Sequence, residues 1–152
     1  MTTAAAPLPD AQAQIGGVIA GLSDSWNRHD MASYGAQFTE DADFVNVIGM
    51  HWKGRAEIIA RHEDVHRTIF RNSTLTTLDY ALRLLAPGVV LAHIQWEMTG
   101  HEPPPGAPFS AAVRHGIITA VFVDQQGRWL ITAFQNTDIV PISLPGMEPK
   151  HE

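Results

Sequence analysis

Residues 90–98 alternate strictly along the chain and read Val90-Leu91-Ala92-His93-Ile94-Gln95-Trp96-Glu97-Met98. The even-numbered residues are all apolar, and the odd-numbered ones are mostly polar. Because successive side chains of a β-strand point to opposite faces of a sheet, this alternation predicts a strand with one face in the protein core. The neighbouring segments on both sides extend this sheet.

From residue 72 onward the sequence has the features of strands joined by turns. Further strands are predicted at residues 78–84, 109–123 and 128–140. The strands are separated by a Pro87-Gly88 turn, a hairpin turn at 124–127, and a loop at 100–108 that contains four prolines. This part of the chain is therefore predicted to form long antiparallel strands.

The first part of the chain has a helical period instead. Ile15, Ile19, Leu22 and Trp26 recur at spacings of four, three and four, which predicts one buried face of a helix over residues 10–29, with Asp10 as its N-cap. The elements expected next are a short helix over 31–38, a strand over 43–48, a turn over 49–54 that contains Trp52, and a helix over 55–70.

This order of elements predicts an α+β fold. Helices that come from only one part of the sequence should cover one face of the sheet and leave a cavity between helices and sheet. The other face also carries apolar side chains and therefore needs a cover. A homodimer packed through the sheet is the simplest way to provide it.

Length and composition limit the function further. The 152 residues fit one domain over residues 10–140, with a disordered lead-in at 1–9 and a flexible tail at 141–152. Ten scattered Lys and Arg against 16 Asp and Glu argue against nucleic acid as a partner. The apolar runs are too short for a membrane span, and no secretory signal is evident, so a cytoplasmic protein is expected. The absence of cysteine excludes disulfides, thiolate metal sites and cysteine nucleophiles.

Several motifs resemble one superfamily. The element order is similar to that of the nuclear transport factor 2-like superfamily, which includes SnoaL-type polyketide cyclases, ketosteroid isomerases and limonene epoxide hydrolases. The following segments resemble its SgcJ/EcaC-type subgroup: Phe38-Thr39-Glu40-Asp41-Ala42-Asp43-Phe44-Val45-Asn46, Trp52-Lys53-Gly54-Arg55, Ser73, His93 with Trp96, and Trp129-Leu130-Ile131-Thr132-Ala133-Phe134-Gln135-Asn136-Thr137. The resemblance covers residues 10–138 and implies a cone-shaped, curved antiparallel sheet wrapped around three N-terminal helices, with a central cavity.

The catalytic residues of ketosteroid isomerases do not carry over to this chain. The position of their general base falls on Asn46, whose neutral amide cannot accept a proton near pH 7. The position of their oxyanion-binding tyrosine falls near Leu22, which has no hydroxyl. What the subgroup does imply is a role in the biosynthesis of enediyne natural products.

His62-Glu63-Asp64-Val65-His66 matches the zinc-protease pattern H-E-x-x-H. Residues 67–72 supply no third ligand, so a protease is disfavoured. Metal binding by His62, His66 and a strand carboxylate stays open as a remote alternative. The preferred interpretation is that His62 points into the cavity as a catalytic acid or base, while His66 packs or faces solvent.

The remaining candidates would bind the substrate. Trp52 and Trp96 are candidates for apolar walls, and Asn46 for orienting a ligand. His115, beside Arg114, is a pocket base, one half of a carboxylate-binding pair, or a sheet or dimer-interface residue. Because Gln135 and Asn136 are consecutive on a strand, only one of them can face the cavity.

Together these features favour cofactor-independent cyclisation, isomerisation or hydration of an apolar or polyketide-like compound. No G-x-G-x-x-G fingerprint and no haem or flavin signature is present, so no cofactor is expected. The alternative is a non-catalytic dimeric module that binds a ligand or a partner protein.

Overall fold

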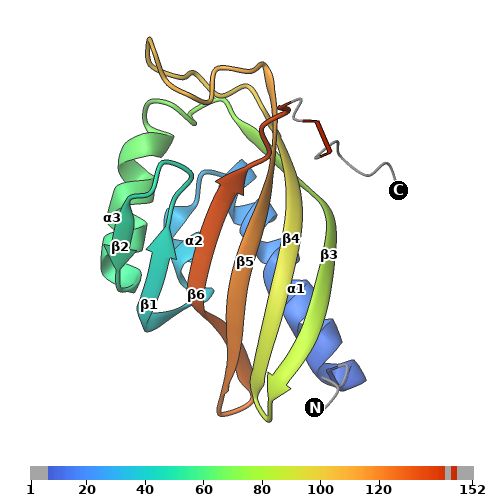
Figure 1. Cartoon of the computed structure of the whole chain (residues 1–152). Coiled ribbons are helices and arrows are strands. Elements are labelled where there is room, and N and C mark those ends of the chain that lie inside the picture. The colour runs from blue at the N-terminus through green and yellow to red at the C-terminus, as the bar shows by residue number, and fades with distance from the viewer. Residues whose placement is uncertain (1–6, 143–144, 147–152) are drawn as a thin grey trace.

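Six strands form one curved sheet in the order β2-β1-β6-β5-β4-β3 (Figure 1). The structure is a computed structural model that describes residues 7–142 and 145–146. The strands are β1 (Phe38–Val45), β2 (His51–Lys53), β3 (Thr74–Ala86), β4 (Val89–Thr99), β5 (Val113–Gln125) and β6 (Arg128–Asp138). With the helices of the first half of the chain, they give the expected α+β fold.

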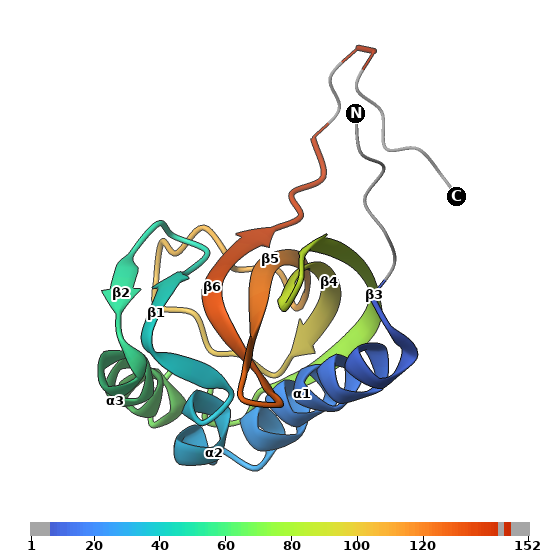
Figure 2. The same cartoon turned by 90° about the horizontal axis from the view of Figure 1, so that it is seen from below.

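Three helices pack on one side of this sheet (Figure 2). They are α1 (Pro9–Asn27), α2 (Met31–Gly35) and α3 (Arg55–His66). The short helix α2 begins at a side-chain cap, because Asp30 accepts a hydrogen bond from the Ser33 amide at 3.1 Å. The predicted face of α1, formed by Ile15, Ile19, Leu22 and Trp26, is buried as expected.

Some boundaries differ from the prediction. Helix α1 begins at Pro9, with Leu8 rather than Asp10 at the N-cap position, because proline is suited to the first helical turn, where its missing N–H costs nothing. Trp52 lies in β2 and not in a turn, since the turn is confined to residues before His51. Residues 1–6, 143–144 and 147–152 of the predicted lead-in and tail lie outside the described residues.

Strand β6 is third in the sheet although it is last in the chain. It pairs with β5 in the antiparallel sense and with β1 in the parallel sense, whereas the other neighbours in the sheet pair antiparallel. The register places Phe44 beside Phe134, and their rings stack at 4.5 Å between centroids. The parallel pairing thus joins the helical first half of the molecule to the long strands of the second half.

The concave face of the sheet forms the core with the helices. The predicted inward face of β4 is confirmed, since Val90, Ala92, Ile94, Trp96 and Met98 are all buried. The opposite residues of this strand, including His93 and Gln95, are on the convex face and largely exposed. Within the described part of the chain, no helix is long and apolar enough to cross a membrane.

Candidate active site in the cavity between helices and sheet

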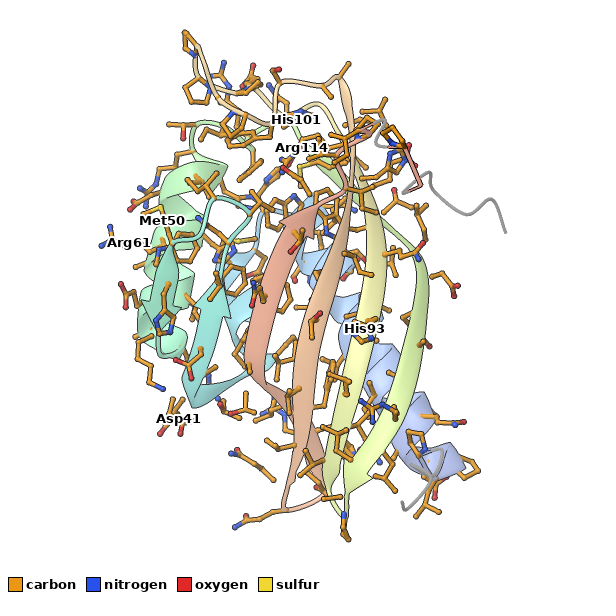
Figure 3. All side chains as sticks on the ribbon, in the orientation of Figure 1. Asp41, Met50, Arg61, His93, His101 and Arg114 are labelled. Carbon is orange, nitrogen blue, oxygen red and sulfur yellow. The ribbon has the colours of Figure 1, made fainter. Side chains whose placement is uncertain are left out.

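A cavity of about 350 Å³ lies between the helices and the concave face of the sheet. All three helices contribute lining residues, as do β1, β4, β5 and β6. Figure 3 shows Met50 and Arg61 on the side of the molecule that carries α3, and Arg114 near the loop between β4 and β5. The lining is mostly apolar and contains a few polar groups, which is the usual character of a small-molecule site.

His62 of α3 lines this cavity and is almost fully buried, with 3% of its surface exposed. Its Nδ1 lies 2.7 Å from the carbonyl oxygen of Ile58, one turn earlier in the helix. A carbonyl only accepts hydrogen bonds, so Nδ1 carries the proton and Nε2 carries the lone pair in the neutral ring. Burial lowers the pKa of His62 to about 4, so the ring is neutral at pH 7.

Aromatic rings surround this imidazole on several sides. Tyr34 lies 4.8 Å from it between ring centroids, Phe44 4.9 Å and Trp52 5.2 Å, the last two edge to face. Burial raises the pKa of Tyr34, so its phenol stays protonated. No described carboxylate forms a hydrogen bond or ion pair with His62. The environment therefore holds a neutral base among apolar rings, without an acidic partner.

The other two fixed residues of the H-E-x-x-H pattern have different surroundings. His66 is buried, packs on Trp26 with ring centroids 4.3 Å apart, and places its Nδ1 2.9 Å from Nδ1 of His29. Glu63 is half exposed and lies 3.9 Å from Arg67. Among the described residues, no group of three or more His, Cys, Asp or Glu side chains is placed to hold a metal ion.

The structure brings four of the predicted substrate-binding residues to the cavity. Trp52 and Trp96 are buried walls, and Asn46 and Asn136 are half-buried polar lining residues. The Trp96 indole N–H donates to Oδ1 of Asn136 at 2.8 Å, which fixes both side chains. Oδ1 of Asn46 instead accepts from the backbone N–H groups of Ile48 and Met50, so this residue also closes the turn between β1 and β2.

The two other predicted substrate-binding residues lie outside the cavity, which corrects the prediction. Gln135 is exposed on the convex face, while its neighbour Asn136 faces inward. His115 is also on the convex face, 3.9 Å from the carboxylate of Glu97 on the adjacent strand. The physical reason is the strand pleat, which turns both residues away from the helices.

Arg114, which the sequence analysis did not select by itself, is the cavity residue of its strand. It is 5% exposed, and its Nη2 donates to Oδ1 of Asp138 at 2.7 Å. The guanidinium carbon lies 5.4 Å from the Trp96 ring centroid and 4.7 Å from that of Phe109. The next inward residue on β5 is Gly116, which pairs with Trp96 on β4. Because Gly116 has no side chain, the Trp96 indole fits over it, beside Arg114.

Comparison with known proteins connects this architecture to a family. A family model described as a SnoaL-like domain matches residues 19–130. A solved structure of an uncharacterised protein with a cystatin-like fold from Caulobacter vibrioides is 28% identical, with a TM-score of 0.78 over 86% of this chain and 90% of that one. A cystatin-like domain of unknown function from Nostoc punctiforme is 24% identical, with a TM-score of 0.76 over 90% of this chain and 82% of that one.

Among more distant structures, a type 2 hexachlorocyclohexane dehydrochlorinase (LinA) has the same fold. Its TM-score is 0.72 at 12% identity, over 93% of each chain. A search of curated proteins finds no match. The family model covers most of the described chain, and the TM-scores show that these solved structures share its fold. The chain is therefore a member of the SnoaL-like domain family.

Proposed function

We propose that the protein is a cofactor-independent acid/base catalyst that acts on an apolar, polyketide-like compound in the cavity. The observation that carries this proposal is the state of His62. Its Nδ1 hydrogen is donated to the Ile58 carbonyl, so Nε2 keeps the lone pair, and the residue lines the cavity. A buried imidazole that is neutral at pH 7 can remove a proton from a bound molecule and return it at another atom.

The surroundings of His62 favour an apolar substrate. Aromatic rings of Tyr34, Phe44 and Trp52 lie within contact of the imidazole, and Trp96 gives a further flat wall. Flat apolar walls suit ring compounds, whose faces they cover without unpaired polar groups. Cyclisation, isomerisation and hydration each need a proton transfer of this kind, and they stay the proposed reaction types.

The resemblance to the SgcJ/EcaC-type subgroup supports a place in natural-product biosynthesis, and we propose membership of that subgroup on the motifs at residues 38–46 and 52–55. One fold neighbour is named as a hexachlorocyclohexane dehydrochlorinase (LinA) and another as LinA, so proteins of this fold include enzymes. The homodimer through the convex face and the cytoplasmic location are parts of the same proposal.

A non-catalytic ligand-binding module is the second candidate. The observation that favours it is the lack of an acidic partner for His62, whose described neighbours are aromatic rings and the Ile58 carbonyl. A histidine base is usually oriented and strengthened by a carboxylate, and a binding protein needs no such partner. The two candidates differ in whether protons of a bound ligand exchange.

Proton exchange with solvent is therefore the test. The apolar ketone 2-tetralone is incubated with the protein in D₂O at neutral pH, and loss of its acidic C–H signal is followed by NMR. The wild type is expected to accelerate exchange over buffer, and His62→Gln to lower the rate by about 10²- to 10⁴-fold, the usual contribution of a general base, or to the buffer rate.

His115→Gln is the matched control, because it makes the same substitution at an exposed histidine on the convex face. It should exchange the ketone protons at the wild-type rate. Full exchange activity in His62→Gln, with an unchanged melting temperature, contradicts the catalytic assignment. Binding of the ketone without any exchange by the wild type favours the non-catalytic module.

A further inference from the structure

Arg114 is a buried cation that has few acceptors for its hydrogen bonds. A guanidinium carries five N–H donors. In this structure Nη2 donates to the carboxylate of Asp138, and Nη1 has only the sulfur of Met98, at 3.7 Å. The Nε–H is buried and has no hydrogen-bond partner. Among the residues that the structure describes, only one of the three guanidinium nitrogens therefore has an oxygen acceptor.

The neighbours of Arg114 stabilise its charge without accepting its hydrogen bonds. The rings of Trp96 and Phe109 lie against the guanidinium at cation–π distances. The ring faces attract the cation, but they leave the N–H groups unpaired. A buried donor without an acceptor costs free energy, and more so when it is charged. An oxygen atom brought in by a ligand would remove that cost.

A second buried donor lines the same cavity. This donor is the indole N–H of Trp52, which has no hydrogen-bond partner among the described residues. Asp138 forms an ion pair with Arg114, and the lining carboxylate Asp64 has a mostly exposed side chain that is paired with Arg67. The wall that holds Arg114 thus lacks acceptors that the chain itself could supply.

We infer that the ligand of this cavity is an apolar ring compound that carries a carboxylate, and that Arg114 binds this carboxylate. The two oxygens of a carboxylate match the parallel N–H groups of a guanidinium, which gives a strong and directional contact. The inference deepens the proposed function, because it places the ionised end of the substrate at Arg114 and its carbon skeleton among the aromatic rings that surround His62.

Access to the guanidinium involves the loop between β4 and β5. Phe109, which lines the cavity and covers Arg114, lies outside the strands, in residues 100–112. Its ring can turn aside without breaking a strand. Arg114 and Asp138, in contrast, are fixed on neighbouring strands, β5 and β6, so the binding group is held by the sheet.

The experiment compares two probes of equal shape, naphthalene-2-carboxylate and naphthalene-2-carboxamide, by isothermal titration calorimetry. The wild type is expected to bind the carboxylate about tenfold more tightly than the neutral amide. Arg114→Met combined with Asp138→Asn removes both charges together, so that no buried carboxylate is left alone, and should bind both probes equally. Asp138→Asn alone removes a competing negative charge and should strengthen binding of the carboxylate only.

Arg61→Met is the matched control, since Arg61 also lines the cavity but has a mostly exposed side chain. It should keep the preference for the carboxylate. Equal affinities in the wild type, no binding of either probe up to its solubility limit, or an unchanged preference in the double variant overturn the inference. A double variant that only melts earlier and keeps its preference shows a structural ion pair, which also overturns it.

This readout is separate from catalysis. A preference for the carboxylate that depends on Arg114, in a protein that exchanges no ketone protons, supports the inference and contradicts the catalytic proposal. Proton exchange that depends on His62, without any preference between the probes, supports the catalytic proposal and contradicts the inference.

Discussion

At the scale of single residues, burial controls the chemistry of two histidines. His62 and His66 are both buried, and burial lowers their pKa values from 6.5 to about 4 and about 3. In the unfolded chain both regain ordinary pKa values. Between about pH 4 and 6.5 the unfolded state therefore binds more protons than the folded state.

The stability of the protein should follow this difference. The free energy of unfolding is expected to rise with pH from about 4 to 6.5 and to level off above 6.5, because protonation favours the unfolded chain only below that value. Urea denaturation across this interval measures it. The double variant His62→Gln/His66→Gln should show a flatter profile, and an equally steep profile in the variant would assign the effect to other groups.

Gly116 gives a second prediction at this scale. A Cβ at this position would lie inside the indole of Trp96, so Gly116→Ala forces the wall of the cavity to shift. We expect the free energy of unfolding to fall by about 1–3 kcal/mol, as for other overpacked cores.

Gly17→Ala is the control for the same substitution, measured by the same urea denaturation. A Cβ at Gly17 meets no atom within 4 Å, and this residue lies in a helix, where alanine is favoured by about 1 kcal/mol over glycine. The control should therefore be neutral or stabilised. A Gly116 variant as stable as the wild type would mean that Trp96 has room to move.

The sequence predicted the inward face of β4 correctly but not that of β5. On β4 the apolar residues at the even-numbered positions of the alternating pattern are all buried. On β5, Val113 and Ile117 share a face with His115, which makes that face the more apolar one at this end of the strand. The true inward residues are Arg114 and Gly116, whose placement depends on Asp138 and Trp96 on other strands. Such contacts between strands cannot be predicted from the alternation of apolar and polar residues along a single strand.

At the scale of elements, the hairpin of β1 and β2 depends on Asn46. Its side-chain oxygen accepts hydrogen bonds from the backbone N–H groups of Ile48 and Met50, at 3.1 and 2.8 Å. Its backbone N–H donates to the carbonyl oxygen of Met50 at 3.0 Å. The predicted turn over residues 49–54 was placed too late in the chain, and Asn46 was assigned to substrate binding, because the three residues of β2 are too few to show an alternation.

Asn46→Ala should therefore loosen the hairpin. We expect faster hydrogen–deuterium exchange at the amides of Ile48 and Met50 and a loss of stability of about 1 kcal/mol. Asn46→Asp keeps an acceptor oxygen and should exchange like the wild type. If the alanine variant exchanged no faster, the turn would be held by its backbone hydrogen bonds alone.

At the scale of the whole molecule, the convex face of the sheet carries apolar side chains that are partly exposed to solvent. Leu91 and Val121 are opposite each other on β4 and β5, Ile117 lies on the same face, and all three are only half-buried. Single exposed apolar residues are ordinary, but several on one face of a sheet favour association.

We expect a dimer in sedimentation equilibrium experiments. Val121→Glu should give a monomer, because association would bury an unpaired carboxylate. Gln12→Glu adds the same charge on the exposed side of α1 and should stay dimeric. A monomeric wild type, or a dimer that tolerates Val121→Glu, would show that this face is not the interface.

The overall architecture was predictable because it depends on the order of elements more than on single contacts. Two helices, a strand, a third helix and a run of long strands allow few arrangements with one shared core. The parallel pairing of β1 with β6 could not be derived in the same way, since it joins segments that are about 90 residues apart and no turn connects them. The resemblance to a known superfamily implied an antiparallel sheet, so it did not predict this parallel pairing either.

The central position of β6 has a consequence for how the chain acquires its structure during synthesis. The strands β3, β4 and β5 can pair as a meander as they emerge, but β1 and β2 have no neighbour in this sheet other than each other until β6 has been made. The ribosome must therefore pass Asp138 before the β1–β2 hairpin can join the meander, and until then the edge of β1 that pairs with β6 is exposed to other chains. A pause in translation between β5 and β6 would be the interval in which this protein is most prone to aggregate.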